Sequence, residues 1–140
     1  MVLRIIDTDH LSLLEQNQPL VVAKLRSFDI ETIAITVVTF EEQMRGRLNK
    51  IRQANSDEKV IAAYSKLQAT AEFLKQFNLI GFDSAACSCF NDFRRQRIRI
   101  GTLDLRIAAI AFSQNAVVVT RNNRDFSKVP GLILEDWTVV

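Results

Sequence analysis

Short, mostly apolar runs that alternate with amphipathic segments constrain this chain more than any other feature. The runs LRII, TIAI and AVVVT are rich in β-branched residues, which is typical of strands buried on both faces of a sheet. Two shorter runs, NLIGF and LIL, fit further strands. Segments with apolar residues at helical spacing separate these runs. We therefore predict an α/β fold: a three-layer α/β/α sandwich around a central, mainly parallel sheet of four to five strands.

Length and composition indicate one compact domain over residues 1–140. The chain is 48% apolar and contains only four glycines and two prolines. Its net charge of +2 is small, so a nucleic-acid partner would depend on local basic patches. Cys87 and Cys89 lie two positions apart in a predicted helix, where their side chains diverge and a mutual disulfide is disfavoured. No apolar run reaches transmembrane length, and we expect a cytoplasmic protein.

Polar side chains follow several of the predicted strands. Asp7 and Asp9 come directly after the first strand, and Glu42 lies near the start of the helix after the second. Asn122 and Asp125 follow the run AVVVT. Because parallel strands end at the same edge of a sheet, we expect these side chains to lie close together.

Asp104 is a further acidic candidate, in the first turn of the predicted helix GTLDLRIAA, although no strand directly precedes this helix. Carboxylates that converge from distant segments repel one another unless a cation lies between them. Oxygen ligands without histidine or thiolate favour Mg²⁺ or Mn²⁺ over zinc. The acids therefore predict a site for one of these hard cations.

Each of these residues also has a purely structural explanation, and the pattern alone does not decide between the two. The single histidine, His10, is expected to be a partly exposed residue of the first helical turn. The structural alternatives are helix capping for Asp7 and Asp9, a T-x-x-E capping box for Thr39 and Glu42, a helix-dipole contact for Asp104, and ordinary turn positions for Asn122 and Asp125.

Four segments in order along the chain carry a family resemblance: IIDTDHLS, ITVVTFEEQMRG, IGTLDLRIAAIA and VVVTRNNRDFSKVPGLILEDW. Together they resemble the PIN domain, and within it the VapC-like ribonuclease toxins of toxin–antitoxin pairs. The resemblance makes Asp7 the first acid and Asp9 its polar companion. Thr39 and Glu42 match the threonine and acid of the second motif, which leaves Glu41 doubtful. Asp104 matches the third acid.

This resemblance implies a metal-dependent endoribonuclease that hydrolyses RNA phosphodiester bonds. Asp7, Glu42 and Asp104 would hold Mg²⁺ or Mn²⁺, and the ion would activate a water and clamp the scissile phosphate. Some relatives carry aspartate at the position of Asn122, so either this amide or Asp125 would complete the catalytic set and a second metal position. Whether a second ion binds stays open.

The resemblance also implies partners. RNA would be the substrate, and Arg121 and Arg124 are the preferred phosphate contacts, with Thr39 and Asp9 as further substrate-binding candidates. A cognate antitoxin is the expected protein partner. We also expect a homodimer, because the amphipathic helices carry more large apolar residues than one small sheet face can cover. These include Phe28, Phe40, Tyr64 and Phe73.

Two other functions fit parts of the pattern. The first is a haloacid-dehalogenase-like phosphohydrolase, since D-T-D-H-L resembles that family's D-x-D opening. In that case Asp7 would be the nucleophile, Lys128 the required late lysine, and Glu42 would have no role. The second is a non-catalytic PIN-like module that binds RNA or protein, which the amide at Asn122 makes plausible.

Overall fold

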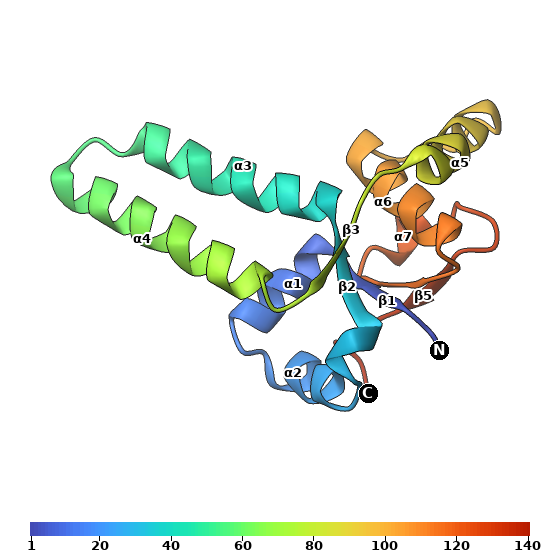
Figure 1. Ribbon diagram of the computed structural model, residues 1–140, viewed down its shortest axis with the longest axis horizontal. Coiled ribbons are helices and arrows are strands. Elements are labelled where there is room, and N and C mark those ends of the chain that lie inside the picture. Colours follow the sequence, from blue (N-terminus) through green and yellow to red (C-terminus); the bar gives the residue numbers. More distant parts are fainter.

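The central element is a five-stranded sheet in a computed structural model that describes residues 1–140. The strands run in the order β3-β2-β1-β4-β5, and every neighbouring pair is parallel (Figure 1). Their bounds are β1 Arg4–Ile6, β2 Ile33–Thr36, β3 Asn78–Ile80, β4 Val117–Val119 and β5 Ile133–Glu135. The predicted parallel α/β sheet of four to five strands is confirmed.

Helices cover both faces of this sheet, and two of them form a long hairpin that projects from it (Figure 1). The hairpin consists of α3 and α4. The helices are α1 Thr8–Glu15, α2 Pro19–Arg26, α3 Val37–Gln53, α4 Asp57–Leu74, α5 Ser84–Arg95, α6 Thr102–Ser113 and α7 Asn123–Phe126, with a 3-10 turn at Ile30–Thr32. No helix combines the length and the apolar character needed to cross a membrane.

Alternate residues of the central strands belong to two different cores. Ile5 and Val118 pack with residues of α5 and α6, whereas Ile6 and Val119 pack with residues of α1 and α2. All four side chains are fully buried. A strand buried on both faces gains apolar burial from every residue, which explains why these runs are continuously apolar and do not alternate.

The strand order places β1 at a topological switch point. The chain leaves β1 for β2 on one side, while β4 joins β1 on the other. Connections that depart in opposite directions open a crevice beyond the carboxyl ends of these two strands, and ligands of open α/β sheets bind in such crevices. Asp7 follows β1 directly and Thr120 follows β4 directly.

Two local predictions are wrong. Asn122 and Asp125 do not lie in an ordinary turn, because Asn123–Phe126 form the short helix α7 with Asn122 as its N-cap. Helix α3 begins at Val37 with Thr36 as its N-cap, and the Thr36 hydroxyl accepts a hydrogen bond from the Thr39 backbone N–H. The T-x-x-E capping box is therefore absent, since Thr39 lies inside the helix.

Candidate functional site

Asp7 lies at the carboxyl end of β1, where it caps helix α1. Its Oδ1 accepts a 2.8 Å hydrogen bond from the Thr8 backbone N–H, and its Oδ2 accepts one of 2.8 Å from the Thr120 hydroxyl. The side chain is only 5% exposed. Burial raises the pKa of Asp7 to about 6, and the charges of Asp9 and Asp104 add to the rise although both hydrogen bonds oppose it. Asp7 can therefore cap helix α1 and also be one of the carboxylates of the candidate site.

Glu42 reaches the same crevice from the second turn of α3. Its Oε1 accepts a 3.0 Å hydrogen bond from the Thr8 hydroxyl. Burial raises the pKa of Glu42, and the negative charge of Asp7 raises it further. Its neighbour Glu41 instead faces solvent and pairs with Arg45 at 2.7 Å. The structure therefore places Glu42, and not Glu41, beside the buried carboxylate.

Asp104 joins this group from the first turn of α6, beside the loop after β4. Asn122 Nδ2 lies 3.4 Å from Asp104 Oδ2 and 3.2 Å from Asp125 Oδ2, so the amide lies between the two carboxylates. Burial raises the pKa of Asp104, followed by the charges of Glu42, Asp125 and Asp9. Asn122 also caps α7 by accepting from the Asp125 backbone N–H.

The raised pKa values show that the carboxylates come from separate elements into one electrostatic neighbourhood. The charge of Asp104 raises the pKa of Asp7, the charge of Asp7 raises the pKa of Glu42, and the charge of Glu42 raises the pKa of Asp104. Ordinary surface acids would be free to move apart. These side chains are instead held by Thr8, by Thr120 and by the amide of Asn122.

The donor set suits a hard cation with a partly retained water shell. No three acidic, histidine or cysteine side chains approach closely enough to enclose a metal ion by themselves. Mg²⁺ keeps several of its waters and takes one or two direct carboxylates, so it does not require such a cage. Oxygen donors alone, held beside one another despite their repulsion, fit this ion and also Mn²⁺.

Asp9 and His10 form a second polar cluster next to these carboxylates. His10 is fully buried, contrary to the expected partial exposure. Its Nε2 accepts a 3.0 Å hydrogen bond from the Trp137 backbone N–H, so its Nδ1 carries the proton that it donates to Asp9 Oδ1 at 3.0 Å. Burial opposes ionisation of Asp9, but its contacts with His10 and the charge of Arg121 lower its pKa overall.

The predicted basic contacts lie at the rim of the crevice. Arg121 is half exposed, with Nε 3.5 Å from Asp9 Oδ2. Arg124 is 91% exposed and lies only 4.0 Å from Asp125. Arg124 is free to reorient toward a ligand, whereas Arg121 is in contact with Asp9. Thr39 is different, because its side chain is fully buried and lies 3.4 Å from the Thr36 hydroxyl. The burial of Thr39 gives no support to its predicted contact with substrate, and its side chain instead lies at the start of α3.

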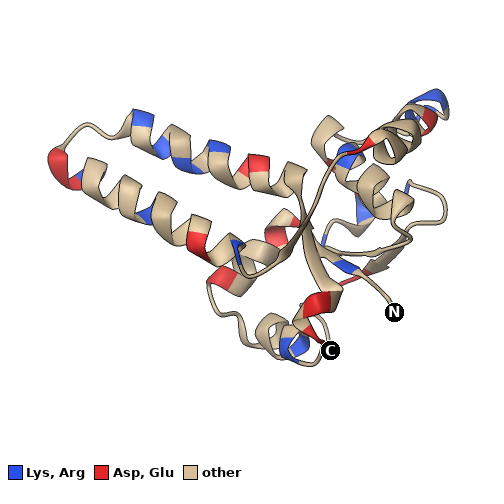
Figure 2. Ribbon diagram, in the orientation of Figure 1, with Lys and Arg blue, Asp and Glu red and all other residues tan.

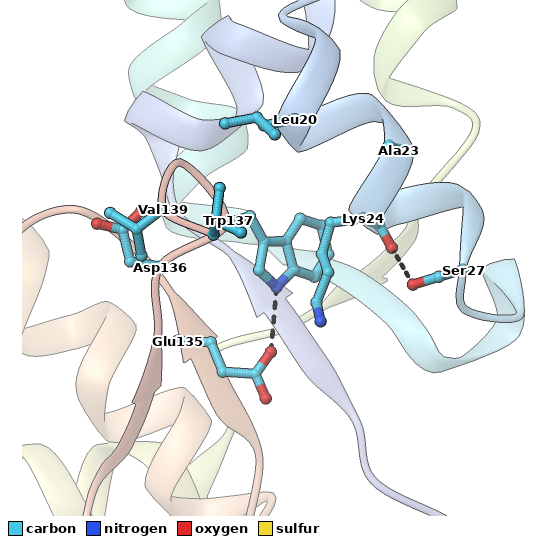
Figure 3. A pocket seen from close by; sticks show the side chains of 9 residues that line it. Leu20, Ala23, Lys24, Ser27, Glu135, Asp136, Trp137 and Val139 are labelled. Atoms are coloured by element: carbon cyan, nitrogen blue, oxygen red, sulfur yellow. Dashed lines mark hydrogen bonds between the residues drawn. The ribbon is translucent and has the colours of Figure 1, made fainter.

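Several open surface pockets lie apart from the carboxylates. One of about 520 Å³ lies between α2 and the C-terminal segment, with the buried indole of Trp137 at its wall (Figure 3). Trp137 Nε1 donates a 3.0 Å hydrogen bond to Glu135. The carboxylates lie apart from this pocket, at the carboxyl ends of β1 and β4.

Several known proteins that are similar in sequence share the name VapC, although no protein-family profile matches the chain. Ribonuclease VapC2 of Rickettsia felis is 32% identical over 111 residues, which cover 76% of this chain and 75% of the relative. The tRNA(fMet)-specific endonuclease VapC of Salmonella typhimurium is 30% identical over 125 residues, covering 78% and 95%. The solved structure of DNA-bound VapBC from Salmonella typhimurium superimposes with a TM-score of 0.80 at 22% identity, over 98% of this chain and 99% of that chain.

Proposed function

Because the chain belongs to the VapC family of ribonucleases, we propose that it is an endoribonuclease that hydrolyses RNA with a Mg²⁺ or Mn²⁺ ion at Asp7, Glu42 and Asp104. One observation carries the assignment of these residues. Three carboxylates from β1, α3 and α6 converge at the switch point of the sheet, where burial and mutual repulsion raise their pKa values. Repulsion of this kind is relieved when a divalent cation binds.

The chain's own groups keep the carboxylates in position. Thr8 joins two of them, since its backbone N–H donates to Asp7 and its hydroxyl donates to Glu42. Thr120 fixes the second oxygen of Asp7. When bound, the ion would polarise the scissile phosphate and lower the pKa of a water. No histidine base is needed, which is consistent with His10 being buried and fully hydrogen-bonded.

Asn122 is the proposed fourth member of the set, and Asp125 supports it. The amide of Asn122 donates to both neighbouring carboxylates, so it reduces their repulsion without adding a charge. Asp125 has a further cation nearby, since Lys128 Nζ lies 3.7 Å from its Oδ1. Part of its charge is therefore already compensated. We propose that Asp104 and Asn122 contribute more to catalysis than Asp125.

The rim residues Arg121 and Arg124 are the proposed contacts to the phosphates beside the scissile bond. Arg121 is held by Asp9, whose pKa is lowered and which is therefore ionised at neutral pH. We propose that Asp9 positions Arg121 and that it contributes to substrate binding only in this indirect way.

The phosphohydrolase alternative receives little support from the structure. Its required lysine, Lys128, contacts Asp125 and donates to the Arg99 carbonyl at 3.3 Å. It is thus held by residues on the α7 side of the crevice. Glu42 would have no role in that chemistry, although it is held beside Asp7 by Thr8.

Family membership also leads us to propose an antitoxin protein as the physiological partner. The hairpin offers a surface for such a partner or for a second copy of this chain, because α4 exposes several large apolar side chains to solvent. These are Val60, Ile61 and Tyr64, with Leu48 on the neighbouring helix α3. Co-expression with the product of an adjacent small reading frame, followed by co-purification, tests this partnership.

Cleavage of total RNA tests the proposed function. The parent protein should cut RNA with Mg²⁺ or Mn²⁺ and should be inactive in EDTA. Glu42→Gln should abolish cleavage, whereas the matched control Glu41→Gln should retain it, because Glu41 pairs with Arg45 at the surface. A parent that binds RNA but never cuts it would instead support the non-catalytic module.

A further inference from the structure

The surface pockets of the molecule differ sharply in charge. The C-terminal pocket is lined by Glu135 and Asp136 against the single cation Lys24 (Figure 3). The pocket between α3 and α4 contains four basic side chains, but two of them, Arg47 and Lys66, pair with Glu15 at 3.6 and 3.1 Å. A third pocket, between α5 and α6, contains arginines and no acid.

This third pocket, which we call the arginine pocket, has a volume of about 520 Å³. It is lined by Phe90, Arg94, Ile98, Arg99, Ile100, Thr102, Leu105 and Arg106. None of its three guanidinium groups takes part in an ion pair. The arginines that do are Arg4, Arg45, Arg47, Arg95, Arg121 and Arg124. Three uncompensated cations around an apolar floor favour an anionic ligand with a flat apolar part.

Two of these guanidinium groups lie beside the same aromatic ring. The Cζ atoms of Arg94 and Arg106 are each 5.7 Å from the centre of the Phe90 ring. Contact with the ring holds both guanidinium groups near the pocket while their N–H donors stay free. Thr102, the first residue of α6, also lines the pocket, so the positive end of the helix dipole adds to the field.

The arginine pocket is physically connected to the carboxylates. Thr102, Leu105 and Arg106 flank Asp104 along α6 and turn toward the pocket. On the other side, Lys128 links the Arg99 carbonyl to Asp125, and Asn122 links Asp125 to Asp104. Figure 2 shows basic residues at the outer end of α5, away from the α3–α4 hairpin.

We propose that the arginine pocket is a subsite for the RNA substrate, which binds a phosphodiester and its base at a distance from the scissile bond. Arginine binds phosphate through paired N–H donors, and unstacked bases of single-stranded RNA lie against guanidinium planes and apolar side chains. This inference rests on the proposed function for its choice of ligand. It goes beyond that function by assigning Arg94, Arg99 and Arg106 to substrate binding.

RNA binding without cleavage tests the proposal. The probe is a short fluorescein-labelled single-stranded RNA of mixed sequence, and anisotropy is recorded in EDTA over a series of salt concentrations. The test variant is Arg94→Gln with Arg99→Gln, because both side chains are exposed. The control is Arg95→Gln with Arg97→Gln, which removes the same charge from the same segment outside the pocket. Thermal melts verify that both variants fold.

The test variant should bind the RNA on the order of tenfold more weakly than the parent at moderate salt. The slope of log K against log salt should fall by about 1.4, since each single-strand phosphate contact contributes about 0.7. The control should keep both the affinity and the slope of the parent. Equal losses in the two variants, or no loss in either, would overturn the proposal, as would a parent that does not bind this RNA.

Two further readouts separate this inference from its premise. If poly-glutamate displaces the RNA from the parent as well as unlabelled RNA does, the pocket recognises acidic peptide and the RNA subsite is wrong. If the parent cuts no RNA with Mg²⁺ or Mn²⁺, the proposed function fails. Normal RNA binding by Asp104→Asn would show that this failure does not come from lost RNA binding. The pocket assignment is still decided by the anisotropy data.

Discussion

The hydroxyl of Thr120 donates a 2.8 Å hydrogen bond to Oδ2 of Asp7, which joins the carboxyl ends of β4 and β1. The same hydroxyl oxygen accepts a 2.9 Å hydrogen bond from the Asn122 backbone N–H. Thr120 is 2% exposed. One buried side chain therefore fixes both the orientation of the first carboxylate and the course of the loop that carries Asn122.

Thr120→Val should impair both stability and activity. The change leaves the Asn122 N–H without its acceptor and Asp7 without a donor, a loss of about 1–3 kcal/mol in unfolding free energy. The pKa of Asp7 should rise further, because the hydrogen bond from Thr120 lowers it. Thr120→Ser keeps the hydroxyl and should be close to the parent in urea unfolding and in RNA cleavage. Equal behaviour of the Val and Ser variants would contradict this role.

Asp7→Asn should change how stability depends on pH in the metal-free protein. The pKa of Asp7 is raised from 3.8 to about 6, so the folded state binds this proton more tightly than the unfolded state. The stabilisation from the protonated carboxyl is complete below about pH 4 and is lost as pH rises to about 6, at a cost of up to about 3 kcal/mol. The variant has no carboxyl group at position 7 that could titrate. In EDTA, the melting temperature of the variant minus that of the parent should therefore increase as pH rises from about 4 to about 6. A constant difference would show that Asp7 has an ordinary pKa.

Asn122→Asp should lower stability without metal and strengthen the response to metal. The new carboxylate would face Asp104 and Asp125, to which the amide now donates. Repulsion should lower the melting temperature in EDTA, and excess Mn²⁺ should raise it by more than in the parent. The control is Asn123→Asp, which adds the same charge at an exposed neighbouring position. If both variants respond equally to Mn²⁺, Asn122 does not face the ion.

Self-association remains a prediction. Of the four aromatic residues that led to it, Phe28 stacks on Trp137, Phe73 packs edge-to-face against Phe77, and Phe40 packs against the core. Tyr64 is 55% exposed. Sedimentation should show a species of about twice the 15.9 kDa of one chain. Ile61→Ser with Tyr64→Ser should shift it to the monomer, whereas Ile133→Ser, which removes a similarly exposed apolar side chain on β5, should not. A parent that sediments only as a monomer would rule the dimer out.

The sequence was sufficient to predict the parts of the site that follow strands. Asp7, Glu42 and Asn122 come soon after buried apolar runs, and parallel strands bring such positions to one edge. Asp104 follows no strand, so the sequence offered it as an acidic candidate, and only the family resemblance indicated that it joins the others. Its position depends on how α6 packs between α5 and the sheet, which no local pattern specifies.

One error concerns a residue whose partner is distant in sequence, and another concerns the end of a strand. His10 is buried because its Nε2 accepts from the Trp137 N–H, 127 positions away, and nothing near His10 predicts this contact. The capping box at Thr39 is wrong because β2 ends at Thr36, which caps α3 instead. Element ends are the least certain part of a sequence-based prediction.

Calorimetric titration with Mn²⁺ tests the central claim most directly, since it needs neither the RNA nor a partner. The parent should bind Mn²⁺ saturably. Asp7→Asn, Glu42→Gln and Asp104→Asn should each weaken binding at least tenfold, because even groups that only orient a ligand contribute about 10–100-fold. Glu41→Gln should bind as the parent does. Unchanged Mn²⁺ affinity in all three acid variants, or no saturable binding by the parent, would contradict a metal site at Asp7, Glu42 and Asp104.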